Sequence, residues 1–482
     1  MDSLKKQFTH GVLFNAAAKY SGIIIQLVVT AILARLLSPD EFGIIAICTV
    51  AIAFFYQFTD MGIGVAIVQR QDLDENDYNH LFSFTIYLGC FLSILFIIGS
   101  FYISEWYVKP DLRIYLQILS LQLLFSSFNA VPNAILLKRK QFRFLAERSI
   151  SLQLITGFLS CIAAYSGWGC YSLLINPVLS SFGLFIINRY KIKLRYNLIF
   201  SLEPLKKIFS YSFYKFAFDL INYFSRNLDK ILTGKYISME QLGYYEKPYR
   251  LVLLPMQNIT GVVNPVVQPV LCEFQSDKER LGAYLIRILK TINMICFPLS
   301  VISFFCAKEV IILFFGEQWH GAVLPFQILS LSIGFQAANH ISGSYFQVAN
   351  NPKAMFWNGL IISIENILGF CIAIFFFNTI VAVSVSVCIV FCFSFFQTYL
   401  LLFKYVYRNM FKYFLTSLCW PILISVVIFI FLYLLSFVPI ESLWMCATMK
   451  IIVYCLLLLT MYHYSDFVKI KEVQFKLMSL IR

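Results

Sequence analysis

The sequence predicts an all-α polytopic membrane protein with about 14 transmembrane helices. Hydrophobic residues make up 60% of its 482 residues and charged residues only 13%. Long apolar runs recur along the chain, well beyond what the core of a soluble domain needs. Lysine and arginine are concentrated in alternate predicted loops, as expected for a chain that crosses a membrane repeatedly. These features predict that lipid, rather than water, surrounds most of the chain.

Each expected helix is an apolar run of roughly 20 residues, which crosses a bilayer at about 1.5 Å per residue. The first run follows Lys5 and Lys6 as a secretory signal would, but Asn15 and Lys19 interrupt it and hydrophobicity continues to Leu33. We therefore expect a retained first helix. In chain order the expected spans are 11–34, 42–67, 81–103, 112–136, 148–165, 168–187, 209–232, 248–271, 283–305, 322–347, 354–376, 379–402, 413–437 and 444–464.

The two halves of the chain repeat one another at a shift of about 200 residues. ARLLSPDEFG at 34–43 aligns with GKYISMEQLG at 234–243. Many transporters are built from such repeats, related by a pseudo-two-fold axis. The basic linker Asn188–Pro204 separates the halves. We therefore expect two six-helix lobes related by pseudo-two-fold symmetry, 1–195 and 205–402, followed by two additional transmembrane helices and a cytoplasmic tail in 403–482.

The expected helix at 209–232 carries five charged residues, although one charge at the centre of a membrane helix costs roughly 2.5–3.5 kcal/mol. Their spacing places most of them on one face, where pairing at i,i+3 and i,i+4 would stabilise them. The repeat predicts a corresponding stripe on the first helix, so both helices should present one polar face to water. The stripe consists of Lys215, Asp219, Asn222, Arg226 and Lys230, and its counterpart of Asn15, Lys19, Gly22 and Gln26.

The formal net charge of +13 follows the pattern of a membrane protein rather than that of a nucleic-acid-binding domain. If both termini are cytoplasmic, about 26 of the 38 Lys and Arg residues fall on the cytoplasmic side, which is the positive-inside pattern. The loops containing Lys140, Arg195 and Lys278 are then inside, and those at 38–41 and 238–241 outside. The basic loops should also attract anionic membrane lipids.

Catalytic and metal-binding motifs are absent from the sequence, which lacks GxSxG, Walker, HExxH and CxxC patterns. The 13 cysteines lie mostly inside apolar runs, where cysteine packs as a small hydrophobic residue. We therefore expect no enzyme, no metal site, no resident cofactor and no nucleic-acid partner.

Ionisable residues inside apolar runs are the best candidates for a functional site, because polar groups in a membrane usually line a substrate or ion path. The alternative is that they form structural ion pairs between helices. We expect the basic and amide groups to bind an anionic headgroup and the acids to bind a coupling ion, H⁺ or Na⁺. The substrate-binding candidates are Lys19, Arg226, Lys215, Asn15, Gln26 and Asn222. The ion-coupling candidates are Asp60, Asp219 and Glu365.

Several segments resemble the Wzx-type polysaccharide and O-antigen flippases. They are ARLLSPDEFGI (34–44), FTDMGIGVAIVQ (58–69), NYFSRNLDKILTGKYI (222–237), LGYYEKPYRLVLLPMQNI (242–259) and FFGEQWHGAVLPFQILS (314–330). The likeness is to the colanic acid exporter-like branch of the multidrug/oligosaccharidyl-lipid/polysaccharide exporter superfamily, and it runs over most of both repeats. It carries no short catalytic signature, so it assigns no site residue.

The resemblance implies a bacterial inner-membrane flippase that works by alternating access. It would move undecaprenyl-diphosphate-linked oligosaccharide units for O-antigen, capsule or exopolysaccharide synthesis, with polysaccharide assembly proteins as further partners. Two alternatives stay open. A drug or cation antiporter of the same superfamily should have a mainly acidic cavity, whereas this sequence mixes Lys and Arg with Asp. A membrane polysaccharide polymerase should have a large outer loop, whereas the expected outer loops are short.

Overall fold

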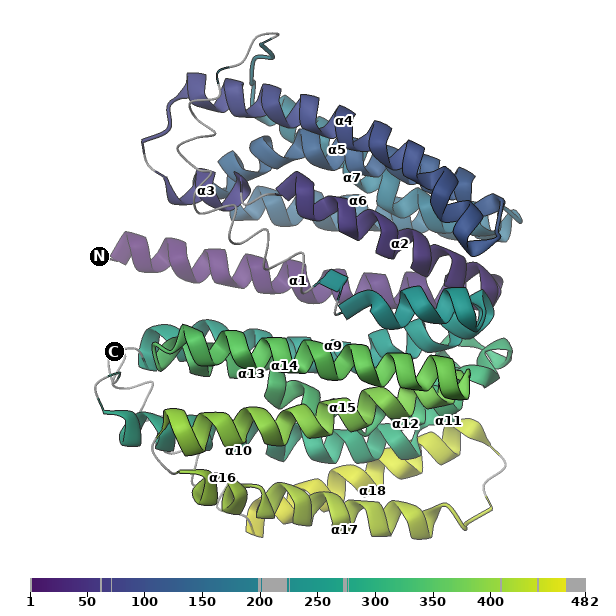
Figure 1. The fold of residues 1–482 in the computed structure, drawn as a ribbon, viewed down its shortest axis with the longest axis vertical. Helices are drawn as coiled ribbons and strands as arrows, with labels where there is room; N and C mark the ends of the chain where they lie inside the picture. The colour runs from purple at the N-terminus through teal and green to yellow at the C-terminus, as the bar shows by residue number, and fades with distance from the viewer. Residues whose placement is uncertain are drawn as a thin grey trace. The chain divides into compact units, whose positions relative to one another are not determined.

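The computed structural model describes residues 2–60, 63–70, 72–197, 201, 223–224, 226–271, 275, 277–407, 410–439 and 442–464. Within these ranges the side chains of 2–18, 60, 262, 264–266, 268–270 and 464 are not described. The chain divides into two compact units, unit 1 (Met1–Gly243) and unit 2 (Tyr244–Arg482). Figure 1 shows that both units are built from long helices, and the described residues contain no strand.

In unit 1, α5 packs against α2, α3, α4 and α7, and α6 packs against α1 and α7. A buried apolar cluster that includes Leu81, Leu136 and Leu145 joins α4, α5 and α6 near one end of the unit. The helices are α1 (Asp2–Leu36), α2 (Pro39–Asp60), α3 (Ile63–Gln69), α4 (Glu75–Tyr107), α5 (Asp111–Lys138), α6 (Phe142–Tyr165) and α7 (Cys170–Lys191).

In unit 2, α10 packs against α12, α13 and α17, while α15 packs against α12, α13 and α14. The last helix, α18, contacts α17, α10 and α11. The elements are α9 (Met239–Leu271), which begins in unit 1, α10 (Lys278–Phe305), α11 (Ala307–Phe315), η2 (Glu317–Ala322), α12 (Val323–Ser330), α13 (Ile333–Val348), α14 (Pro352–Ile372), η3 (Ala373–Phe377), α15 (Ile380–Leu400), η4 (Leu401–Val406), α16 (Phe411–Ser417), α17 (Cys419–Leu435) and α18 (Leu443–Tyr464).

Ten helices of the described chain are long and apolar enough to cross a membrane, or eleven if one bent pair forms a single span. The bent pair covers the expected span at 322–347, and the helix direction changes by 55° between 317–330 and 333–348. The Ser330 and Ser332 hydroxyls donate to the Phe326 and Leu329 carbonyls, at 2.7 and 2.6 Å. Such local side-chain bonds to the backbone favour helix bending.

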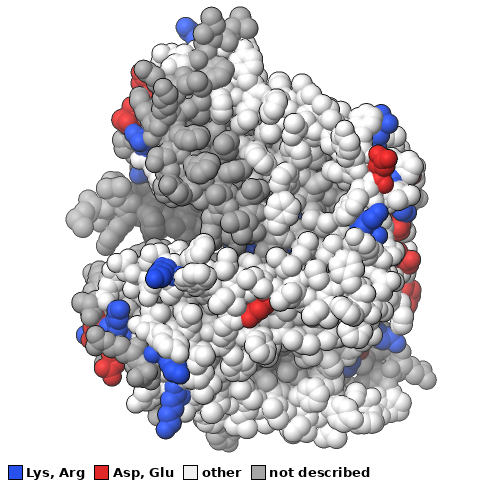
Figure 2. All heavy atoms as spheres, viewed as in Figure 1, with Lys and Arg blue, Asp and Glu red and all other residues white. Residues whose placement is uncertain are grey.

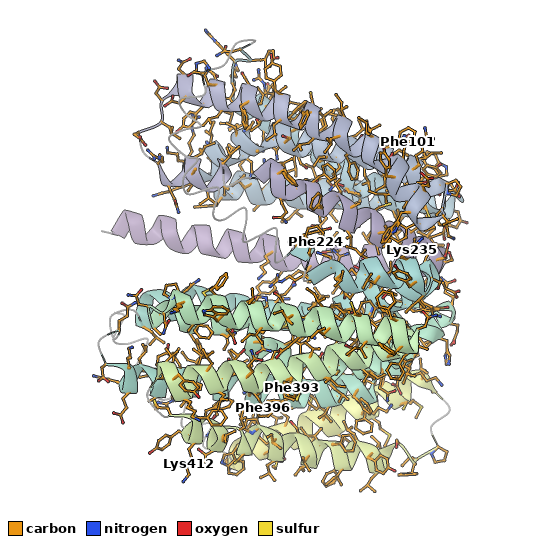
Figure 3. All side chains as sticks on the ribbon, in the orientation of Figure 1. Phe101, Phe224, Lys235, Phe393, Phe396 and Lys412 are labelled. Atoms are coloured by element: carbon orange, nitrogen blue, oxygen red, sulfur yellow. The ribbon has the colours of Figure 1, made fainter. Side chains whose placement is uncertain are left out.

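Charged residues lie mainly at the helix ends, as a membrane protein requires. Figure 2 shows one face of the protein, on which Lys, Arg, Asp and Glu gather at the ends of the helices and leave a mostly uncharged band between them. Figure 3 labels Phe393 and Phe396, which lie in the last two turns of α15, and Lys412 on α16 at an end of unit 2. Both phenylalanines are exposed, as side chains in contact with lipid would be.

The two repeated loops of the sequence contact each other in unit 1. Ser38 caps α2: its Oγ accepts from the Glu41 amide at 3.4 Å, and its own amide donates to Glu41 Oε2 at 2.7 Å. Ser238 Oγ likewise accepts from the Gln241 amide at 3.1 Å. A Cβ atom at Gly43 would lie 1.7 Å from the Met239 carbonyl oxygen, and one at Gly243 would lie 2.0 Å from the Pro39 carbonyl oxygen. Because positions 39 and 239 correspond in the repeat, the contact is reciprocal, and only glycine fits on either side.

Loops of unit 1 gather at two ends. At one end, which we call the basic end, Lys138 Nζ donates to the Arg70 carbonyl, and the Arg195 amide donates to Asn79 Oδ1 at 2.7 Å. At the other end, Lys109 Nζ lies 3.9 Å from Asp40 Oδ2. The basic end therefore unites the lysine- and arginine-rich loops after α5 and α7.

Candidate functional site

The structure describes only part of the predicted polar stripe. Lys215, Asp219 and Asn222 lie outside the described residues. Asn15 and Asp60 belong to α1 and α2, but their side chains lie outside what the structure describes. Their predicted roles stay predictions. The geometry of the candidate site is therefore built from Lys19, Gln26, Arg226 and Glu365.

Lys19 and Gln26 are exposed on α1, seven residues apart and thus on one face of the helix. The Lys19 ammonium lies 6.0 Å from the centre of the neighbouring Tyr20 ring. Between them, the Gly22 carbonyl accepts a hydrogen bond from Gln153 Nε2 of α6 at 2.9 Å. Further along, a Cβ atom at Gly157 of α6 would lie 2.7 Å from Val29. Close packing with α6 thus fixes α1 while leaving both polar side chains accessible.

Arg226 belongs to a helical segment, 226–236, that packs against α2 and α4. Just before it, the Tyr223 hydroxyl donates to the Val50 carbonyl, and Tyr107 of α4 donates to the Ile231 carbonyl at 3.1 Å. At the far end, Lys235 donates to the Trp106 carbonyl with its ammonium 5.5 Å from the Trp106 ring. Figure 3 labels Lys235 together with Phe224 from this part of the chain.

The charges of this segment differ in burial. Arg226 is exposed, whereas Asp229 is only 2% exposed. Among the described residues no ion pair joins the two, so the i,i+3 pairing considered from the sequence does not form in this conformation. An exposed guanidinium retains its hydrogen-bond donors for an anion.

Glu365 lies on α14 of unit 2 and is half-buried. Its Oε2 atom is buried without a hydrogen-bond partner. The helix is held tightly against α15, where Thr398 Oγ1 donates to Asn358 Oδ1 at 3.1 Å and a Cβ atom at Gly369 would lie 2.6 Å from Ser386 Oγ. A carboxylate oxygen without a partner in an apolar helix can accept a proton or a cation.

A buried ion pair in unit 2 was not predicted from the sequence. Lys450 Nζ of α18 lies 2.5 Å from Glu309 Oε1 of α11, and the two side chains are only 10% and 5% exposed. The same ammonium donates to the Phe305 carbonyl at 2.8 Å, and the Cys446 thiol lies 3.1 Å from Glu309 Oε1. The available signal was Lys450 itself, a single charge inside the apolar run 444–464. Its partner is 141 positions away, which no spacing rule reveals.

The segment 242–259 also buries charge. Lys247 Nζ lies 3.3 Å from Glu246 Oε2, and each side chain is 12% exposed. Next to them, Tyr245 is fully buried and its ring stacks on Tyr249 with a centroid distance of 5.5 Å. This part of α9 is thus a packed polar element of unit 2, and its charges are not among the predicted site residues.

The bundles of apolar helices, with charges at their ends and a few polar groups between, define a multi-span membrane protein. The chain belongs to a family described as "Polysaccharide biosynthesis protein", whose model matches residues 32–324. Two curated relatives are similar over most of their length. The teichuronic acid biosynthesis protein TuaB of Bacillus subtilis is 26% identical over 333 residues, covering 69% of each chain. The lipopolysaccharide biosynthesis protein WzxC of Escherichia coli is 24% identical, covering 68% of this chain and 67% of that protein.

Solved structures share the fold at low sequence identity. The lipid II flippase MurJ in an inward closed conformation matches with a TM-score of 0.74 and 18% identity, over 95% of this chain and 100% of that one. An inward-facing multidrug resistance transporter of the MATE family matches with a TM-score of 0.62 and 14% identity, over 82% of this chain and 96% of that one. The family match confirms the predicted membership of a polysaccharide biosynthesis family, and these structures show the shared fold.

Proposed function

We propose that the protein is a flippase that moves undecaprenyl-diphosphate-linked oligosaccharide units across the bacterial inner membrane by alternating access. Its membership of a polysaccharide biosynthesis family and the name of the relative WzxC support a role in making lipopolysaccharide or a related polymer. The observation that carries the proposal is the pair of exposed cations, Lys19 and Arg226, within helices of such a fold.

A diphosphate cannot cross hydrocarbon unless nearby cations compensate its charge. Lys19 and Arg226 would supply that compensation, with Arg226 able to bind two oxygens at once, and Lys215 would add to it. Gln26, Asn15 and Asn222 would bind the sugars. Asp60, Asp219 and Glu365 would couple transport to an H⁺ or Na⁺ gradient. Binding and movement need no bond to be broken, so the proposal includes no catalysis, cofactor or nucleic acid.

The same proposal includes 14 helices in two lobes with both termini in the cytoplasm. The reciprocal contact of Gly43 and Gly243 supports pseudo-two-fold symmetry, because each repeat presents the same loop to the other. The basic end of unit 1 supports the orientation, because positively charged loops favour the cytoplasm. In a variant without native cysteines, a cysteine at position 195 should react with an impermeant thiol reagent only after the cells are opened. Labelling in intact spheroplasts would reverse the orientation.

Transport of the lipid-linked unit is the direct test of function. In cells of the source organism that lack the gene, the wild-type protein should restore surface polysaccharide. Lys19→Ala and Arg226→Ala should insert normally but leave lipid-linked units inside, since losing one charged hydrogen-bond partner weakens binding by roughly ten- to a hundredfold.

Lys109→Ala is the matched control, because it removes one positive charge from unit 1 outside the stripe. Proteoliposomes that contain the purified protein and the oligosaccharide lipid extracted from those cells separate transport from the rest of the pathway. Equal transport by wild type and Arg226→Ala would contradict the predicted role of Arg226 in binding the substrate. Absence of transport by the wild type would contradict the proposed function.

A further inference from the structure

Unit 1 also contains a cation that is buried without a counter-ion. Arg148 of α6 is 9% exposed. Its Nη2 atom donates to Asn133 Oδ1 of α5 at 2.7 Å, but Nε and Nη1 are buried without hydrogen-bond partners. Among the described residues no carboxylate forms an ion pair with it. Burying a charge without a counter-ion is costly, so this guanidinium is set up for an anion that arrives from outside the chain.

Neighbouring side chains from three helices complete a polar site. Arg148, Leu152 and Thr156 lie four residues apart on the face of α6 that meets α7, where Thr156 donates to Asn176 at 2.8 Å and Leu152 contacts Gly183. The antiparallel packing places Arg148 level with Asn188, near the end of α7. Asn188 is fully buried and donates to Asn129 of α5 at 2.6 Å, leaving its own Oδ1 without a partner.

A lysine lies beside the same position. Lys191, in the last turn of α7, has its ammonium 5.5 Å from the centre of the Phe144 ring. The Arg148 guanidinium lies 6.0 Å from the centre of that ring. Phe144 is thus flanked by two cations, one exposed and one buried. The α6 helix also begins here, without a side-chain cap, so its free amide groups add positive potential.

We propose that Arg148, Lys191 and the asparagines of α5 and α7 form a binding site for the phosphate group of a membrane lipid at the basic end of unit 1. The guanidinium and the ammonium bind phosphate oxygens, and Asn133 holds the guanidinium in place. Because the site lies where helices end, a lipid phosphate reaches it from the headgroup region. This site is separate from the stripe of Lys19 and Arg226, and the inference holds whether or not the protein is a flippase.

Two lipids carry the required chemistry, and the experiment distinguishes them. The purified full-length protein in detergent is titrated with phosphatidylglycerol, with undecaprenyl diphosphate, with inorganic phosphate and with monoolein, which has no phosphate. The readout is the thermal unfolding midpoint, from which an apparent Kd is obtained. Stabilisation by phosphatidylglycerol identifies a site for bilayer lipid. A response to undecaprenyl diphosphate alone identifies a site for the polyprenyl carrier. A response to inorganic phosphate at similar concentration identifies a site that needs no lipid tail.

Arg148→Gln should raise the apparent Kd of whichever compound stabilises the wild type by roughly ten- to a hundredfold. Arg143→Gln is the matched control, since Arg143 is an exposed cation on the same helix, paired with Glu147 at 2.7 Å, and should bind as the wild type does. Arg148→Lys keeps the charge and should retain part of the response, so a folding defect of Arg148→Gln alone does not decide the test.

The absence of stabilisation by all three phosphate compounds would overturn the proposal. Equal responses of wild type, Arg148→Gln and Arg148→Lys would also overturn it. Arg148→Met adds an independent check, because removing an uncompensated buried charge should raise the midpoint of the ligand-free protein while abolishing the response to ligand. A lower midpoint together with an unchanged ligand response would mark Arg148 as a packing residue.

Discussion

Ionisable side chains of the helices differ in burial and pairing, and the contrast between a buried ion pair and two exposed cations separates structure from transport. Lys450 and Glu309 of unit 2 are buried and bonded to each other. Lys19 and Arg226 of unit 1 are exposed, and Arg226 forms no ion pair with a described residue. A buried pair is satisfied by the protein itself, whereas an exposed cation keeps its charge for a ligand. Glu365, half-buried with one oxygen unpartnered, lies between them.

The largest effect on stability is expected from breaking the buried pair. Glu309→Gln should lower the free energy of unfolding by about 3–5 kcal/mol, because it leaves the Lys450 ammonium buried without a counter-charge. Lys450→Met should have a similar effect through Glu309. Thermal unfolding of the purified protein measures both. The double variant Glu309→Leu/Lys450→Met should recover most of the loss, because apolar residues of similar size often replace a buried pair without cost.

Failure of the double variant to recover would mean that Glu309 or Lys450 has another essential contact. The Phe305 carbonyl and the Cys446 thiol are the neighbours to examine, because both lie within hydrogen-bonding distance of the pair. If the single variants unfold like the wild type, burial is no guide to structural importance in this chain. The contrast between the paired and the exposed charges would then disappear.

This contrast also shows how far the sequence predicts the structure. Apolar runs located most long helices, and the expected boundary between the spans 148–165 and 168–187 is confirmed, since α6 ends at Tyr165 and Gly167 has a φ of +81°. Hydropathy alone does not mark helix ends: the acidic stretch 70–80 indicates a helix start, and α4 begins at Glu75 with Asp74 and Asp77 forming a capping box, although the apolar run starts six residues later. Capping depends on polar residues that hydropathy counts as loop.

The candidate site was predicted by residue type rather than by contact. Periodicity placed Lys19 and Gln26 on one face of α1, and both are exposed. The Lys450–Glu309 and Arg148–Asn133 contacts could not be predicted, because each depends on how helices pack in three dimensions. Spacing relates residues within one helix, whereas a buried charge is satisfied by whichever helix lies beside it. The domain boundaries and the roles of Lys215, Asp219, Asn222, Asn15 and Asp60 stay predictions.

Substitution of Glu365 should change the stability by an intermediate amount and should raise it, whereas Glu309→Gln should lower it. Glu365→Gln removes a charge whose Oε2 atom has no partner, so the free energy of unfolding should rise by about 1 kcal/mol. The same substitution should abolish the response of transport to an imposed H⁺ or Na⁺ gradient in proteoliposomes. Asp60→Asn is the companion variant, with the same expected loss of response. Gradient responses like those of the wild type in both variants would place coupling elsewhere.

The smallest effect on stability is expected at Arg226. This variant is the most direct test of the role of the exposed cations. Arg226→Ala should change the free energy of unfolding by no more than about 0.5 kcal/mol, because the side chain is exposed and unpaired with Asp229. Transport should nevertheless fall strongly, and Arg226→Lys should restore only part of it, since an ammonium cannot make the bidentate contact of a guanidinium.

The double variant Arg226→Ala/Asp229→Ala distinguishes this account from structural pairing. If Arg226 serves only to neutralise Asp229, removing both charges should restore transport that Arg226→Ala lacks. If Arg226 binds the diphosphate, the double variant should stay inactive at normal expression, because no cation remains at that position.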